Sequence, residues 1–234
     1  VVYTTINSFY ITLDDFSFNQ FENIFKINKI TFISKKVAVI GCAGGVGASF
    51  LAREYAGYIS SNNNGNSCLL EKSLFNSTQM LINGITDKKQ VSLKDISTAI
   101  DSQLLESVTH QINNNLDLCS PLAEYPVNMD KSYAFDSFIY NNFNNVISDY
   151  SFHSYNVFFN DVLRSDTIVL VTNGNLTCIK NTSLIISMLT RNGFSSDRIK
   201  LVVNGGTSNN SIKEDMKIYK KHFPNLNILQ LGRV

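Results

Sequence analysis

The stretch GCAGGVGAS at residues 41–49 decides how the rest of this 234-residue chain is interpreted. It follows the apolar run Val37–Ile40, which is typical of a strand buried on both faces. Downstream, apolar residues recur at helical spacing from Phe50 to Ile59. A glycine-rich turn between a strand and a helix gathers backbone N–H groups and a helix N-terminus around one point, and this geometry binds phosphate.

The sequence on both sides of this turn alternates between expected strands and helices. Helical periodicity extends over residues 177–192 and 211–222, and Gly193 is a suitable residue to end the first of these helices. The alternation predicts an α/β fold with a mostly parallel sheet and helices on both faces. The further expected strands are Cys68–Leu70, Leu116–Cys119, Val146–Ser148, Thr167–Thr172, Ile199–Val203 and Leu226–Leu229.

Two parts of the chain differ in composition. Residues 36–234 carry the alternating pattern and are predicted to form one domain. Residues 1–35 contain no glycine and are rich in aromatic and β-forming side chains. This N-terminal segment is interpreted either as the tail of a preceding receiver-like domain or linker, or as an edge element packed on the main sheet.

Charge and hydrophobicity exclude several functions. The chain has 20 basic and 19 acidic residues, so it lacks the positive field on which nonspecific DNA binding depends, and no nucleic-acid partner is expected. No stretch approaches 18 apolar residues, so no membrane span is expected. The cysteines lack the spacing of zinc ligands and are predicted to be buried free thiols of a cytoplasmic protein. They are Cys42, Cys68, Cys119 and Cys178.

The loop departs from the common phosphate-binding pattern G-x-x-x-x-G-K-[ST] at two positions. Gly47 and Ser49 are kept, whereas Cys42 stands in place of the first glycine and Ala48 in place of the lysine. The segment resembles the deviant Walker A loop of the ParA/MinD superfamily, K-G-G-x-G-K-[ST]. Relative to that pattern, this chain also has Ala43 in place of the signature lysine. This resemblance extends over about residues 36–234.

The resemblance implies an ATP and Mg²⁺ site built from several segments. Glu71 and Asp149, each at the end of an expected strand, stand where the family has carboxylates, and both are candidate catalytic residues. Ser49 and Asp149 are the candidate metal-binding residues, and Asn204 matches an asparagine that contacts adenine. The candidate nucleotide-binding residues are Gly44, Gly45, Val46, Gly47, Ala48, Ser49 and Asn204.

Each of the polar side chains in this set also has a purely structural interpretation. Ser49 can cap the helix that it opens. Glu71 and Asp149 can be ordinary residues of strand ends or turns, and Asn204, which two glycines follow, can simply form a turn. The sequence leaves these alternatives open.

The two alanines weaken the expected nucleotide site. A charge-assisted hydrogen bond from lysine to phosphate contributes roughly 1.5–3 kcal/mol. Loss of two such contacts weakens binding by about 3–6 kcal/mol, or roughly 10²- to 10⁴-fold. The transition state of phosphoryl transfer also loses its main charge stabiliser. Binding of ATP and Mg²⁺ is therefore expected to be weak or absent, and fast hydrolysis is not expected.

Three segments resemble the CpaE/TadZ group of pilus-assembly proteins within the superfamily: Arg164–Asp166, Asn181–Leu189 and Asp197–Ile199. This resemblance implies a homodimeric localisation or assembly factor for pilus or secretion machinery. Its partners would place it at the cell pole or the inner face of the membrane. One alternative is a working ATPase of the MinD or ParA type in positioning or partition. Another is a structural domain that presents a partner surface without using nucleotide.

Overall fold

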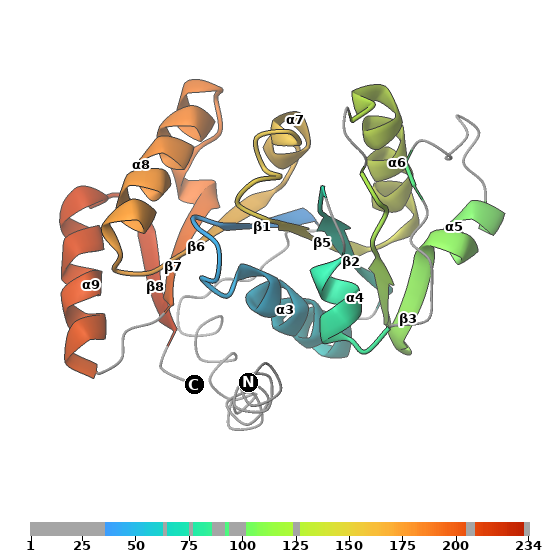
Figure 1. Cartoon of the computed structure of the whole chain (residues 1–234), viewed down its shortest axis with the longest axis horizontal. Coiled ribbons are helices and arrows are strands. Elements are labelled where there is room, and N and C mark those ends of the chain that lie inside the picture. Colours follow the sequence, from blue (N-terminus) through green and yellow to red (C-terminus); the bar gives the residue numbers. More distant parts are fainter. Residues whose placement is uncertain are drawn as a thin grey trace, which may run out of the picture.

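The computed structural model describes residues 36–62, 65–74, 77–85, 92–93, 102–123, 127–204 and 209–231. The expected N-terminal segment, residues 1–35, lies outside the described residues. The described part forms a central sheet with helices packed on both of its faces, as Figure 1 shows. The predicted α/β fold is therefore confirmed.

In the described part of the chain, eight strands form one sheet in the order β3-β4-β2-β5-β1-β6-β7-β8. All neighbouring strands are parallel except the pair β3 and β4, which is antiparallel and lies at one edge. The strands are β1 (Lys36–Gly41), β2 (Ser67–Lys72), β3 (Thr109–Asn113), β4 (Leu116–Cys119), β5 (Asn145–Tyr150), β6 (Thr167–Thr172), β7 (Ile199–Asn204) and β8 (Asn227–Leu231).

The helices divide between the two faces. Helices α3 and α4 cover one face, and α6, α7 and α8 cover the other, with α9 beside β8 at the end of the sheet (Figure 1). The helices are α3 (Ala48–Asn62), α4 (Thr78–Ile82), α5 (Ser102–Val108), α6 (Met129–Asn142), α7 (Phe159–Leu163), α8 (Leu176–Arg191) and α9 (Asn209–His222), with a short 3₁₀ turn at Ser196–Arg198. None of the described helices is long and apolar enough to cross a membrane.

Alternation along each strand builds two separate hydrophobic cores. In β1, Val37 and Val39 contact the core under α3, whereas Ala38 and Ile40 contact the core under α6 to α8. All four are at most 2% exposed, as a central strand covered on both faces requires. The four cysteines are buried and free, which confirms the prediction from their spacing.

The helix after β6 shows how local sequence signals place an element. The side chain of Asn175 accepts a hydrogen bond from the backbone N–H of Thr177 and caps α8. Residues three and four apart, from Cys178 to Leu189, face the core. Gly193, at φ +82°, then takes the left-handed conformation that ends the helix, as predicted.

The strand order places the end of β1 at a topological switch point. From β1 the sheet grows toward β5, β2 and β4 on one side and toward β6, β7 and β8 on the other. In open parallel sheets, ligands bind beyond the carboxyl ends of the strands at such a point. The loop at residues 41–49 begins there, and so the fold brings the candidate phosphate loop to the expected position.

Candidate nucleotide site

The loop between β1 and α3 has the backbone shape of a phosphate cradle. Gly45 and Gly47 have φ angles of +74° and +87°, a conformation that side chains disfavour. A Cβ atom on Gly47 would also lie 2.5 Å from Nδ2 of Asn204. Gly47 is therefore required both by its conformation and by its neighbour, whereas Gly44 has no such constraint.

Three hydrogen bonds hold this loop against the sheet and α8. The backbone N–H of Cys42 donates to the carbonyl of Val171 at 2.8 Å, and Asn181 Nδ2 donates to the carbonyl of Cys42 at 2.8 Å. On the far side, Asn204 Nδ2 donates to the carbonyl of Val46, also at 2.8 Å. The loop is thus anchored at both ends by side chains that come from distant strands and helices.

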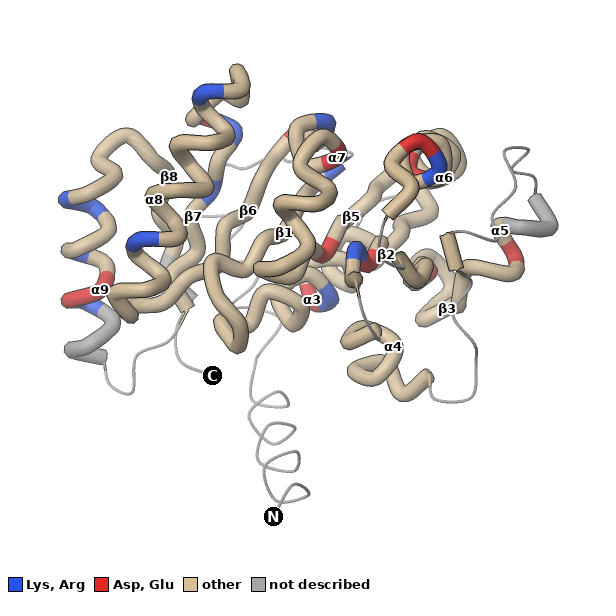
Figure 2. The backbone as a smooth tube through the Cα atoms, turned by 45° about the horizontal axis from the view of Figure 1, so that its top comes forward, with Lys and Arg blue, Asp and Glu red and all other residues tan. Residues whose placement is uncertain are grey.

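The middle of the loop keeps its own donors available. Among the described residues, no backbone carbonyl accepts a hydrogen bond of good geometry from the N–H groups of Gly44 to Ala48. Gly44 and Gly45 are exposed, and α3 begins at Ala48, so its first N–H groups face the same side. Figure 2 shows the loop without a charged residue, in agreement with Ala43 and Ala48. The cradle therefore fits phosphate through its backbone and lacks the cationic side chains.

Cys42 is not a reactive thiol despite its place in the loop. Its side chain is fully buried, and burial raises the pKa of the thiol to about 12, although the hydroxyls of Thr182 and Thr172 act in the opposite direction. The thiolate is the nucleophilic and metal-binding form of cysteine. Cys42 therefore remains protonated at neutral pH and fills space beneath the loop.

Asp149 lies beneath the start of α3 and is 2% exposed. Its Oδ2 accepts a hydrogen bond of 2.6 Å from Nε2 of Gln79, whereas its Oδ1 has no hydrogen-bond partner among the described residues. Burial is the main cause that raises the pKa of Asp149 to about 7. Three smaller effects act on this pKa: hydrogen bonds from the Gln79 amide and the Ser49 hydroxyl lower it, and the nearby charge of Glu71 raises it. The carboxyl group is thus held close to Ser49, with one oxygen still uncommitted.

Glu71 lies directly beside Asp149, but both of its carboxylate oxygens already accept hydrogen bonds from the protein. The two residues are register partners on the neighbouring parallel strands β2 and β5. Oε1 of Glu71 accepts from the backbone N–H groups of Thr78 at 2.7 Å and Gln79 at 3.2 Å. Its Oε2 accepts from the hydroxyls of Ser77 and Ser120, the latter at 2.8 Å. Glu71 therefore fastens the first turn of α4.

The donor set at Ser49 and Asp149 fits Mg²⁺ in the way that nucleotide sites use this ion. Among the described residues, no group of three His, Cys, Asp or Glu side chains could hold a metal by itself. Mg²⁺ is usually held by one or two protein oxygens together with water and substrate phosphates. The uncommitted Oδ1 of Asp149 and the Ser49 hydroxyl would be the protein oxygens for such an ion. A bound Mg²⁺ would neutralise charge on the β- and γ-phosphates of ATP.

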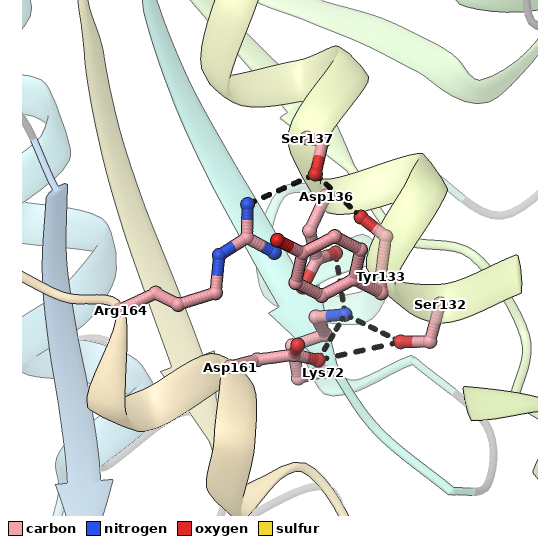
Figure 3. A network of polar contacts seen from close by, with 7 residues as sticks. All are labelled: Lys72, Ser132, Tyr133, Asp136, Ser137, Asp161 and Arg164. Atoms are coloured by element: carbon pink, nitrogen blue, oxygen red, sulfur yellow. Dashed lines mark hydrogen bonds and ion pairs between the residues drawn. The ribbon is translucent and has the colours of Figure 1, made fainter. Parts of the chain in front are cut away.

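The opposite face of the sheet carries a second buried polar cluster, which the sequence did not indicate. Lys72 follows Glu71 on β2, and its side chain therefore points to the face covered by α6 and α7. Its Nζ lies 2.5 Å from Asp136 Oδ1, 3.4 Å from Asp161 Oδ2 and 3.1 Å from the Ser132 hydroxyl (Figure 3). All of these side chains are buried, so the cation is committed to structure.

The structure brings most of the predicted site residues together. The loop from Gly44 to Ser49 lies next to Asp149 and Glu71 on one side and Asn204 on the other. One expectation needs correction: α3 begins at Ala48, so Ser49 is its second residue and does not occupy the capping position. The observed strands β2 and β5 also extend two residues beyond the expected carboxyl ends at Leu70 and Ser148, so Glu71 and Asp149 lie within them.

Two residues of the site were missed by the sequence reasoning. Gln79 connects Asp149 with the carbonyl of Ser49, and Asn181 holds the loop at Cys42. The sequence did carry a signal for the helix that holds Gln79, because Ser77 precedes the short apolar run at Met80. In the structure, the Ser77 hydroxyl caps α4 by accepting a hydrogen bond from the backbone N–H of Met80 at 2.9 Å. No local pattern marks Asn181.

Solved structures with the same fold include a ParA family ATPase, a cell division protein complex and a protein in complex with ATP. A ParA family ATPase from Chlorobium tepidum TLS superposes with a TM-score of 0.71 at 20% identity, over 86% of this chain and 85% of that chain. The MinC:MinD cell division protein complex of Aquifex aeolicus matches with a TM-score of 0.68 at 15% identity, over 85% and 82%. A Cyanothece McdA variant in complex with ATP matches with a TM-score of 0.59 at 14% identity, over 83% and 82%.

The similarity lies in the fold and does not extend to sequence at a level that identifies a family. No protein-family model matches the chain, and no curated protein matches it. The identities of 14–20% with the three solved structures support a common architecture. The function of this chain therefore has to be argued from its own site.

Proposed function

We propose that this chain is a localisation or assembly factor that binds Mg-ATP weakly or not at all and does not hydrolyse it rapidly. One observation carries the proposal: the loop keeps the glycine conformations of a phosphate cradle and has alanine at 43 and 48. Backbone donors orient phosphates, whereas charged side chains supply much of the binding energy and of the stabilisation of the transition state. The site thus retains the shape for nucleotide without the charge for catalysis.

The carboxylates support the same conclusion. Glu71 accepts four hydrogen bonds and has no free lone pair directed at a water molecule that would attack a phosphate. Asp149 keeps one oxygen for a metal ion. The described site therefore has metal-binding capacity, and its two candidate catalytic carboxylates are engaged in structure or metal binding.

For the cellular role, we propose a homodimeric protein of the CpaE/TadZ type, in the cytoplasm and recruited by pilus or secretion components to the cell pole or inner membrane face. The support is the resemblance of the segments 164–166, 181–189 and 197–199 to that group. The fold is also that of the MinD protein in the MinC:MinD complex of Aquifex aeolicus. Pilin, secretion-ATPase and prepilin-peptidase genes beside this gene are the expected finding, and a monomer in light scattering at all concentrations would contradict the dimer.

A second candidate function is a working ATPase of the MinD or ParA type. The observation that favours it is the similarity to a McdA variant solved with ATP. Titration calorimetry with Mg-ATP, combined with a phosphate-release assay, separates the two functions. The proposed factor gives weak binding and no turnover, whereas turnover equal to that of an intact ATPase of this fold would overturn the proposal.

Restoring the lysines tests the cradle directly. Each of Ala43→Lys and Ala48→Lys is expected to strengthen Mg-ATP binding by roughly 10- to 100-fold, because each adds one charge-assisted contact. Ala48→Met is the matched control, since it adds a side chain of similar length without charge. Equal affinities for Ala48→Lys and Ala48→Met would show that the loop does not position phosphate.

A further inference from the structure

Helix α4 is fastened at its start to the same carboxylates that line the nucleotide site. Glu71, 3% exposed, accepts hydrogen bonds from the backbone of Thr78 and Gln79 and from the hydroxyl of Ser77. The Ser77 hydroxyl in turn accepts from the backbone N–H of Met80 at 2.9 Å. One buried side chain of β2 therefore provides the first attachment of this short helix to the sheet.

The side chain of Gln79 extends from this helix into the space between Ser49 and Asp149. Its Nε2 donates to Asp149 Oδ2 at 2.6 Å and to the backbone carbonyl of Ser49 at 2.7 Å. Gln79 is fully buried. Both hydrogens of the amide are thus used to connect Asp149 of β5 with the first turn of α3.

Two oxygens of this pair are left over. Neither Gln79 Oε1 nor Asp149 Oδ1 has a hydrogen-bond partner in the part of the chain that the structure describes. A buried acceptor without a donor costs about 1–3 kcal/mol. The unpaired Oδ1 of Asp149 is an oxygen ligand suited to a cation. The contact between Gln79 and Asp149 therefore leaves one buried oxygen on each side chain without a hydrogen bond.

We propose that Gln79 is a positioning residue that acts as a latch on the metal side of the site. Its amide donates to Asp149 Oδ2 and to the Ser49 carbonyl. A cation held at Asp149 Oδ1 would draw negative charge from the carboxylate and so weaken the hydrogen bond that Oδ2 accepts from Gln79. Loss of this hydrogen bond would release the Gln79 side chain, which is the second attachment of α4, and would loosen the first turn of the helix. This inference rests on the proposed function, because it assumes that the loop and Asp149 receive Mg²⁺ and nucleotide together.

The test uses the full chain carrying Ala48→Lys, so that affinity is measurable, with and without Gln79→Met. Methionine keeps the length of the side chain and removes its donors and acceptor. The latch predicts that Gln79→Met strengthens binding of Mg-AMPPNP by about tenfold, since one strong competing hydrogen bond is lost. Binding of AMPPNP in EDTA is expected to stay the same in both backgrounds. Gln111→Met, at an exposed position of β3, is the matched control.

Hydrogen exchange provides a second readout that a merely structural glutamine would not change. In the Ala48→Lys background, Mg-AMPPNP is expected to speed exchange of the amides at residues 79–83, because release of Gln79 loosens α4. Unchanged affinity in Gln79→Met together with unchanged or slower exchange would overturn the latch while the proposed function stands. If Ala48→Lys itself gains no affinity, the proposed function fails, and the latch fails with it.

Discussion

The two faces of the sheet handle buried charge at the end of β2 in opposite ways. On the α3 and α4 face, Glu71 is surrounded by neutral donors, and its neighbour Asp149 keeps an unpaired oxygen. On the α6 and α7 face, Lys72 provides a cation that is locked between Asp136 and Asp161. One face has its cation built in, and the other leaves a carboxylate without one. The α3 and α4 face is therefore the one suited to receive a cation from outside the chain.

Removing the built-in cation has the largest expected effect. Lys72→Met leaves Asp136 and Asp161 buried without a positive partner, and loss of one member of a buried ion pair costs about 3–5 kcal/mol. Urea unfolding measures this change in the free energy of unfolding. Lys180→Met, at an exposed site on α8, is the control and is expected to stay within about 0.5 kcal/mol. A loss of less than about 1 kcal/mol in Lys72→Met would remove the distinction between the faces.

The next largest expected effect is the pH dependence of folding stability, to which one carboxyl group on each face contributes. Burial raises the pKa of Asp136 from 3.8 to about 7, although Lys72 lowers it, and the pKa of Asp149 is raised to the same value. A raised carboxyl pKa means that the folded state binds the proton more tightly. The stability from each group is therefore fully present below about pH 3.8 and is lost as the pH rises through about 7.

The corresponding variant is Asp136→Asn, measured by urea unfolding between pH 4.5 and 7. One proton accounts for a slope of up to about 1.4 kcal/mol per pH unit. We expect the parent chain to lose stability across this range and Asp136→Asn to lose less, by about 2–3 kcal/mol over two pH units. Asp149→Asn gives the matching measurement on the other face. Equal slopes in the parent and in both variants would exclude protonation of these carboxyl groups as the cause.

The loop on the nucleotide face is expected to respond to substitution in a graded way. Gly47→Ala combines a positive φ with a Cβ 2.5 Å from Asn204, and we expect a loss of about 1–3 kcal/mol. Gly45→Ala has the positive φ but open space around it, so a loss of about 1 kcal/mol is expected. Gly44→Ala has neither constraint and is the control. Thermal unfolding ranks the three, and equal midpoints would refute the loop conformation.

A matched pair of serines gives the smallest effects. Ser120→Ala removes one of the four donors to Glu71, and Ser132→Ala removes the hydroxyl 3.1 Å from Lys72 Nζ. Each is expected to cost about 1 kcal/mol, because the charged partner keeps its other contacts. Chemical denaturation measures both. A cost above about 3 kcal/mol in either variant would mean that its hydroxyl is indispensable to that cluster.

Several elements of the fold were predictable because their signals are local. The β1 strand, the loop glycines and α8 with its end at Gly193 follow from apolar periodicity and turn chemistry. The edge strand β3 was not predicted, because Thr109–Asn113 has no apolar run and pairs at a sheet edge where burial is mixed. Its strand character comes from pairing with β4.

The candidate site divides in the same way. The candidate phosphate loop with its alanines at 43 and 48 and the candidate carboxylates Glu71 and Asp149 could be predicted from the sequence, since each is marked by its place after an apolar run. Which of these carboxylate oxygens lack a hydrogen-bond partner depends on the tertiary structure. Glu71 is occupied by α4, Asp149 is joined to Gln79 from 70 residues away, and Lys72 pairs with Asp161 from 89 residues away. Such contacts depend on strand register and helix packing, which no local period of side chains encodes.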